Sequence, residues 1–185
     1  SDFSVNLATG KVTIHESYNT DITVSLIDTG QLTMTGGRVG LLEKYIGDET
    51  FFVTYGDGLA NIDLDSLLSF HRNHGKIATV TAVRPIARFG ELVIGDEMTV
   101  TSFKEKPQIG EGWINGGFFV FEPELFTYID NENTVLEKEP LERIATAQQL
   151  VAYPHEGFWQ CMDTKRDHDL LSKLASLVNP PWFRD

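Results

Sequence analysis

The feature that most constrains the fold is a succession of strand, helix and strand between residues 51 and 83. Residues 51–55 form an apolar, aromatic run that stops at Gly56, and this pattern predicts a strand buried on both faces. Apolar side chains then recur at helical spacing over residues 64–71, after a candidate N-cap at Asp63, and residues 77–83 form another apolar run. Such a unit places its two strands parallel in one sheet, so we expect an α/β fold with a Rossmann-like, doubly wound mixed sheet.

Shorter patterns on either side add two hairpins, three strands and four helices. The hairpins are expected over residues 5–15 and 92–103, the strands over residues 21–27, 118–121 and 151–153, and the helices after residues 35, 123 and 140 and over residues 167–177. No repeat or linker interrupts the chain, so we expect one domain over residues 1–185 with hairpin insertions.

The charge balance limits the kinds of partner. Fifteen Lys and Arg residues against 27 Asp and Glu residues give a net charge of −12. This field repels polyphosphate and argues against nucleic acid and anionic membranes as partners, so an anionic substrate must be held locally, by a few basic groups, backbone N–H groups or a bound cation. The single cysteine, Cys161, suits a reducing compartment, and no apolar run approaches the ~20 residues that span a bilayer, so we expect a soluble, cytoplasmic protein.

The most informative local segment is Tyr55-Gly56-Asp57-Gly58. Ligands of open α/β sheets bind outside the carboxyl ends of the strands, and Asp57 stands where a predicted strand stops. A carboxylate there suits Mg²⁺, which takes one or two protein carboxylates together with substrate phosphates; the alternative is a turn in which Asp57 caps a loop. Asp163 precedes the last predicted helix, and it either caps that helix or joins Asp57 at the metal.

Two further segments offer polar groups to a ligand. Lys106, before Pro107, presents a point charge to a phosphate or is only solvated. Asn115-Gly116-Gly117 allows close backbone approach and offers an amide to hydroxyl groups, or forms a β-bulge or turn.

Other chemistries find less support in the sequence. His71 and His74 lack companion metal ligands, which favours helix packing for the first and exposure for the second. The chain has no Gly-x-Ser-x-Gly elbow and no Cys/His constellation, so a hydrolase is not supported.

Read together, these segments resemble the sugar-nucleotidyltransferase family along nearly the whole chain, and most closely its members that transfer a cytidylyl group to glucose 1-phosphate. The resemblance is carried by Asp28-Thr29-Gly30, Thr35-Gly36-Gly37-Arg38, Thr54-Tyr55-Gly56-Asp57-Gly58, Phe70-His71, Arg88-Phe89-Gly90, Glu105-Lys106-Pro107, Ile114-Asn115-Gly116-Gly117-Phe118-Phe119, Gly157-Phe158-Trp159-Gln160 and Met162-Asp163-Thr164. The order of these segments, and Thr-Gly-Gly-Arg in place of the different nucleotide loop of uridylyl and thymidylyl relatives, makes the match specific.

The resemblance implies transfer of CMP from CTP to α-D-glucose 1-phosphate, which gives CDP-glucose and pyrophosphate for bacterial dideoxysugar and O-antigen synthesis. It also implies that Asp57 and Asp163 hold Mg²⁺ and act in catalysis with Lys106. It assigns the nucleotide to Thr35, Gly36, Gly37, Arg38, Tyr55 and Gly56, and the sugar phosphate to Glu105, Lys106, Asn115, Gly116, Gly117 and Trp159.

The chain departs from the family pattern at its beginning. Family members open with a strand, a glycine-rich loop that cradles the triphosphate and a catalytic Lys, which these residues lack. At ~30 residues per strand–helix–strand unit, we expect roughly two units in front of Ser1 in the intact enzyme. The sheet edges exposed without them favour a homo-oligomer, and residues 1–27 form either a subunit-contact arm or an ordinary surface hairpin.

Two other functions remain open at this point. One is a related nucleotidyltransferase with another base or sugar. The other is a non-catalytic remnant that binds a sugar phosphate or serves oligomerisation.

Overall fold

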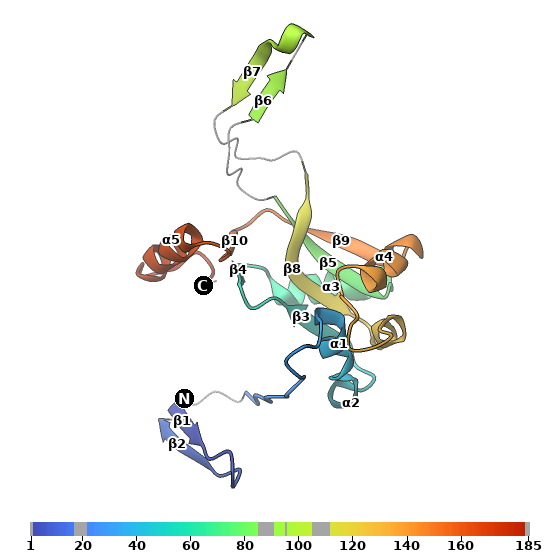
Figure 1. The fold of residues 1–185 in the computed structure, drawn as a ribbon, viewed down its shortest axis with the longest axis vertical. Coiled ribbons are helices and arrows are strands. Elements are labelled where there is room, and N and C mark those ends of the chain that lie inside the picture. The colour runs from blue at the N-terminus through green and yellow to red at the C-terminus, as the bar shows by residue number, and fades with distance from the viewer. Residues whose placement is uncertain (1, 17–21, 85–90, 95, 105–111, 184–185) are drawn as a thin grey trace.

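A four-stranded mixed sheet forms the centre of the computed structural model, which describes residues 2–16, 22–84, 91–94, 96–104 and 112–183 (Figure 1). Its strand order is β3 (Phe51–Thr54), β8 (Ile114–Phe121), β5 (Ala78–Val83) and β9 (Leu150–His155). β8 runs antiparallel to β3 and β5, and β9 runs parallel to β5. The predicted parallel direction of β3 and β5 is therefore confirmed, although β8 lies between them.

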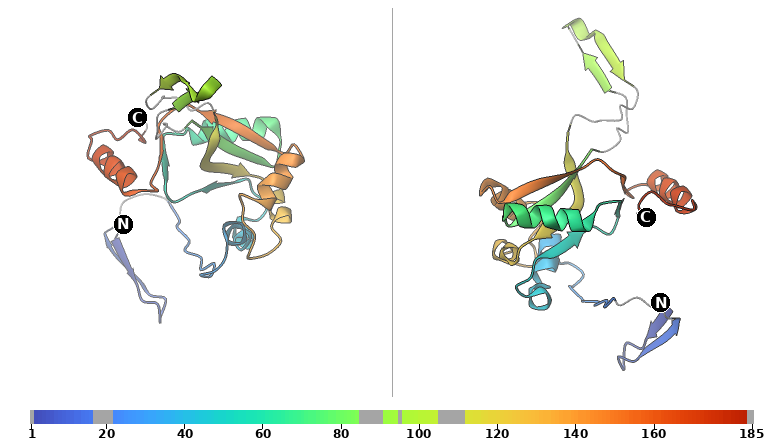
Figure 2. Two further views of the ribbon diagram at one scale, coloured as in Figure 1. Left: turned by 45° about the horizontal axis from the view of Figure 1, so that its top comes forward. Right: turned by 180° about the vertical axis from the view of Figure 1, so that it is seen from behind.

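The helix between these strands forms where the sequence predicts it. α3 (Leu64–His74) begins at Asp63, whose side chain accepts a hydrogen bond from the backbone N–H of Ser66, and ends at Gly75 in the left-handed conformation. Leu67 is fully buried and packs with Val120 of β8, so α3 covers one face of the sheet (Figure 2).

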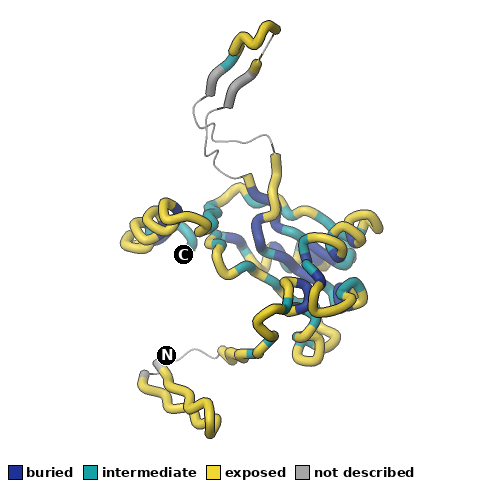
Figure 3. The backbone as a smooth tube through the Cα atoms, viewed as in Figure 1, coloured by how far each residue is buried: buried dark blue, intermediate teal, exposed yellow. Residues whose placement is uncertain are grey.

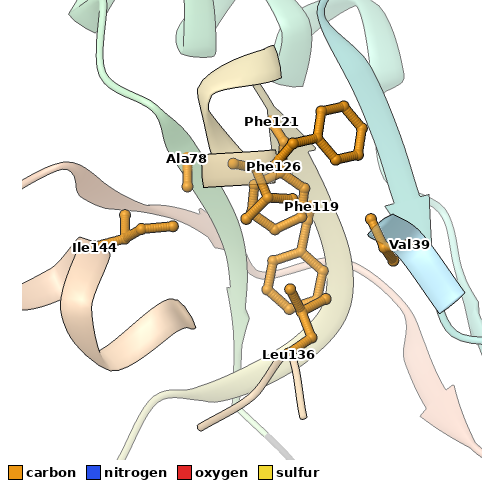
Figure 4. Packing of buried hydrophobic residues seen from close by; sticks show 8 residues of the cluster. Val39, Ala78, Phe119, Phe121, Phe126, Leu136 and Ile144 are labelled. Carbon is orange, nitrogen blue, oxygen red and sulfur yellow. The ribbon is translucent and has the colours of Figure 1, made fainter. Parts of the chain in front are cut away.

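The opposite face of the sheet carries the larger core. Phe119 and Phe121 alternate with Val120 along β8, and their rings stack 5.3 Å apart. Figure 4 shows them between Val39 and Ile144. With helical segments on both faces, the structure has the doubly wound α/β arrangement that the sequence predicts.

The remaining elements surround this centre. They are β1 (Asp2–Val5), β2 (Val12–Glu16), α1 (Thr35–Gly40), α2 (Glu43–Ile46), β4 (Gly58–Ala60), β6 (Glu91–Ile94), the 3₁₀ helix η1 (Asp96–Met98), β7 (Val100–Lys104), the 3₁₀ helix η2 (Pro123–Tyr128), α4 (Glu139–Thr146), β10 (Trp159–Cys161) and α5 (Lys165–Ala175). β1 pairs with β2, β6 with β7 and β4 with β10, each antiparallel. Figure 3 shows that the buried residues lie in the central body and that the β1–β2 hairpin is exposed.

Three expectations about these elements are wrong. Residues 22–27 form no strand, because no described strand pairs with them. β3 is not buried on both faces: it is an edge of the described sheet, and Phe52 is 43% exposed. His74 is partly buried rather than exposed, because its ring contacts the hydroxyl of the buried Thr79.

Within the described ranges, no helix has the length and apolar character needed to cross a bilayer.

Candidate functional site

The strand ends that carry most of the predicted site residues meet at one edge of the sheet. β3 leaves the sheet there through Tyr55, Gly56 and Asp57, and β8 enters there because it runs in the opposite direction. The backbone N–H of Tyr55 donates to the carbonyl oxygen of Gly117 at 3.0 Å, which extends the β3–β8 ladder to this edge. This is the carboxyl edge of β3 and β5, where open α/β sheets bind ligands.

β8 is distorted at this edge by two extra residues. Val80 pairs with Phe119 and Ala82 pairs with Asn115, so residues 116–118 stand opposite Thr81 alone. Gly117 has a φ of 76°, and a Cβ on it would lie 2.7 Å from Cδ2 of Tyr55. The β-bulge that the sequence left as an alternative is therefore present, and it lies beside the site residue Asn115.

Asn115 belongs to a hydrogen-bonded network centred on a carboxylate. Its Nδ2 donates to Oη of Tyr55 at 3.1 Å, and Oη of Tyr55 donates to Oε1 of Glu137 at 2.6 Å. The other carboxylate oxygen of Glu137 accepts a hydrogen bond of 2.7 Å from the hydroxyl of Thr35. The network joins Thr35, predicted on the nucleotide side, to Asn115, predicted on the sugar side.

The phenol of Tyr55 stays protonated in this setting. Burial is the main cause that raises its pKa well above its ordinary value, followed by the hydrogen bond to Glu137. The charge of Asp57 also raises the pKa of Tyr55, and it contributes least of these causes. The sequence patterns do not single out Glu137 as a site residue. The one feature that marks it is its position just before the helix predicted at Pro140.

Asp57 and Asp163 lie at the same end of the β4–β10 ribbon. Gly58 pairs with Cys161, and the backbone N–H of Met162 donates to the carbonyl oxygen of Asp57 at 2.9 Å. Both aspartates are exposed, so the fold presents two distant carboxylates to solvent from adjacent backbone positions.

The alternative roles of these aspartates find little support. The N-cap of α5 is Thr164, which forms a capping box with Asp167, so Asp163 does not cap that helix. Oδ2 of Asp163 accepts a hydrogen bond of 3.3 Å from the thiol of Cys161. If Asp57 capped a loop, its carboxylate would accept a hydrogen bond from that loop. Among the described residues, no hydrogen bond to the Asp57 side chain is found.

The chemistry of these two carboxylates suits a magnesium ion. No group of three or more His, Cys, Asp or Glu side chains suited to a metal occurs in the part of the chain that the structure describes. Both side chains offer hard oxygen donors, and Mg²⁺ commonly takes one or two protein carboxylates and completes its coordination with phosphates and water.

The Thr35–Arg38 segment forms the start of α1. Gly36 and Gly37 are buried, and a Cβ on Gly36 would lie 2.8 Å from the carbonyl oxygen of Thr134. The chain's own 132–136 segment thus gives these glycines a packing role. Arg38 is exposed and donates to the hydroxyl of Thr29 at 2.6 Å.

The remaining predicted residues fall into two groups. Nε1 of Trp159 donates to the carbonyl oxygen of Gly116 at 2.7 Å, which ties β10 to the bulge. Glu105, Lys106 and the segment 88–90 lie outside the described residues.

The chain belongs to the nucleotidyl transferase family, because residues 10–167, more than half of its length, match that family. It is 43% identical over 183 residues to glucose-1-phosphate cytidylyltransferase of Salmonella typhi, a match that covers 98% of this chain and 71% of that protein. It is 34% identical over 150 residues to the catalytic subunit beta of mannose-1-phosphate guanylyltransferase of Dictyostelium discoideum, with 78% of this chain and 41% of that protein covered.

A solved structure agrees with the fold. A chain from Bacillus anthracis, described as a glucose-1-phosphate thymidylyltransferase in complex with sucrose, superimposes with a TM-score of 0.60 at 19% identity. The match covers 84% of this chain and 65% of that one, so this chain spans about two thirds of that relative's length. At this identity the likeness supports the fold alone: the Rossmann-like, doubly wound mixed sheet expected from the sequence has the form of the nucleotide-diphospho-sugar transferases.

Proposed function

We propose that the protein transfers CMP from CTP to α-D-glucose 1-phosphate and so makes CDP-glucose and pyrophosphate. The observation that carries this proposal is the meeting of Asp57 and Asp163 at one end of the β4–β10 ribbon, beside the Tyr55–Asn115 network. The choice of cytidine and glucose is supported by the 43% identity to the Salmonella cytidylyltransferase, which exceeds the 34% identity to the guanylyltransferase subunit.

In this reaction an oxygen of the sugar phosphate attacks the α-phosphorus of CTP. A new P–O bond forms to the sugar phosphate, the bond from the α-phosphorus to the bridging oxygen breaks, and pyrophosphate leaves with both electrons of that bond. The protein needs no covalent nucleophile, because its task is to bring two anions together and hold them in line.

The chain's own residues divide this task. Asp57 and Asp163 would hold Mg²⁺, which when bound neutralises phosphate charge. The amide of Asn115 would hydrogen-bond a hexose hydroxyl, and Lys106 would contact the sugar phosphate. Thr35 and Arg38, both exposed, would face the nucleotide.

The test is pyrophosphate release from CTP and glucose 1-phosphate with added MgCl₂, compared with separate assays in which GTP, UTP or dTTP replaces CTP, or mannose 1-phosphate replaces glucose 1-phosphate. Asp57→Asn should lower kcat by at least about 100-fold, because one of two charged metal ligands is lost. Asp48→Asn, a change of the same chemistry at an exposed loop position, is the control and should keep wild-type turnover.

Two outcomes would contradict the proposal. Wild-type turnover in Asp57→Asn would remove this aspartate from the metal site. Faster product formation with another nucleotide or with mannose 1-phosphate would leave the family in place and overturn the choice of substrates.

A further inference from the structure

Glu137 links two exposed residues of the proposed site, Thr35 and Asn115, and is itself partly buried. It lies in the segment before α4, and its two oxygens accept hydrogen bonds from Tyr55 and Thr35. The oxygen of Thr35 already accepts a hydrogen bond of 3.0 Å from the backbone N–H of Leu136. The carboxylate of Glu137 can only accept, so the single hydroxyl hydrogen of Thr35 points toward it.

The other end of the network is fixed by a backbone group. The N–H of Gly117 donates to Oδ1 of Asn115 at 2.8 Å, and a backbone N–H can only donate. Asn115 must then turn its Nδ2 toward Tyr55, so the phenol oxygen accepts this bond and its own hydrogen goes to Glu137. Every hydrogen bond in the network thus has one direction, and the donors lead from both ends to the two oxygens of Glu137.

This direction leaves defined groups for ligands. One N–H of Asn115 and one lone pair of its Oδ1 are unused within the network, on a side chain that is exposed. Because the middle of the network is partly buried, its hydrogen bonds are screened less than those of a surface pair.

On the basis of the function proposed above, we propose that Glu137 is a positioning residue that couples the two substrate sites. It holds the amide of Asn115 in the orientation that offers an N–H to a hydroxyl of the hexose phosphate. Through its other oxygen it holds Thr35 on the nucleotide side. Glu137 itself contacts neither substrate.

The direct test is Glu137→Gln, which keeps the shape but leaves one acceptor oxygen where two hydroxyls need one each. The freed amino group competes as a donor at Tyr55 or Thr35 and disturbs the orientation of Asn115. The KM for glucose 1-phosphate should rise about tenfold, with a smaller effect on kcat, because a charged hydrogen-bond acceptor is lost. Glu132→Gln, at an exposed position of the same segment, is the matched control and should leave both constants unchanged.

A double-mutant cycle separates coupling from general damage. Tyr55→Phe removes the link between Glu137 and Asn115 and retains the ring, so it should raise the same KM by a similar factor. The double variant should then be no worse than the poorer single variant. Multiplicative effects of the two changes would overturn the coupling, as would an unchanged KM in both single variants. Tyr55→Phe also keeps the test decisive if Glu137→Gln fails to fold.

A measurement without turnover distinguishes this inference from the proposed function. The side-chain amide signals of Asn115 in a ¹⁵N NMR spectrum, assigned with Asn115→Asp, should move in Glu137→Gln and stay in place in Glu132→Gln. Unmoved signals in a protein with normal turnover would overturn the positioning role and leave the function standing. Moved signals in a protein that makes no CDP-glucose would support the positioning role and overturn the function.

Discussion

Gly117 shows how one residue shapes the candidate site. Its φ is 76°, and a Cβ on it would lie 2.7 Å from Cδ2 of Tyr55, so this position has no room for a side chain. Gly117→Ala should lower the free energy of unfolding by about 2–3 kcal/mol, the sum of a strained backbone and a displaced Tyr55 ring. Gly112→Ala is the matched control, because a Cβ there meets no atom within 4 Å. Urea unfolding of both variants measures the difference, and equal stabilities would contradict the close approach of Gly117 and Tyr55.

Among the elements, the β1–β2 hairpin exposes an apolar face. Its register pairs Phe3 with Ile14 and Val5 with Val12 on one face, and all four side chains are 41–65% exposed. Two strands alone are marginally stable in water, so we propose that residues 1–27 pack against a second copy of the chain. Ile14→Thr should shift sedimentation toward smaller species, whereas Thr13→Ser on the other face should not. A wild-type protein that sediments as a monomer would contradict the arm.

At the scale of the whole molecule, we propose that residues 1–185 are one domain whose stability depends on pH through α3. Nδ1 of His74 accepts a hydrogen bond from the backbone N–H of Lys76, which requires this nitrogen to be unprotonated, and the Nε2–H of the neutral ring donates to the hydroxyl of Thr79. Burial is the main cause that lowers the pKa of His74 below its ordinary 6.5, followed by the charges of His71 and Lys76. Below pH 6.5 the unfolded chain therefore binds more protons than the folded chain, and stability falls with falling pH.

The thermal midpoint of the protein should drop between pH 7.5 and 5.5, and it should drop less in His74→Gln. Equal drops in the two proteins would exclude His74 as the cause.

The local features that could be predicted from the sequence depend on neighbours along the chain. Asp63 and Gly75 bound α3 through contacts within a few residues, and apolar periodicity marks β5 and β8. The strand-like pattern of residues 22–27 failed as a predictor, because a strand also requires a partner that the pattern does not supply.

By itself, the sequence determined the fold class and both caps of α3, since each depends on residue type and spacing. Only the tertiary structure decided that β8 lies between β3 and β5, that Asp57 and Asp163 share one ribbon end, and that Glu137 joins Thr35 to Tyr55. Those contacts span up to 106 residues of chain between Asp57 and Asp163, and no local preference encodes which distant segments will pack together.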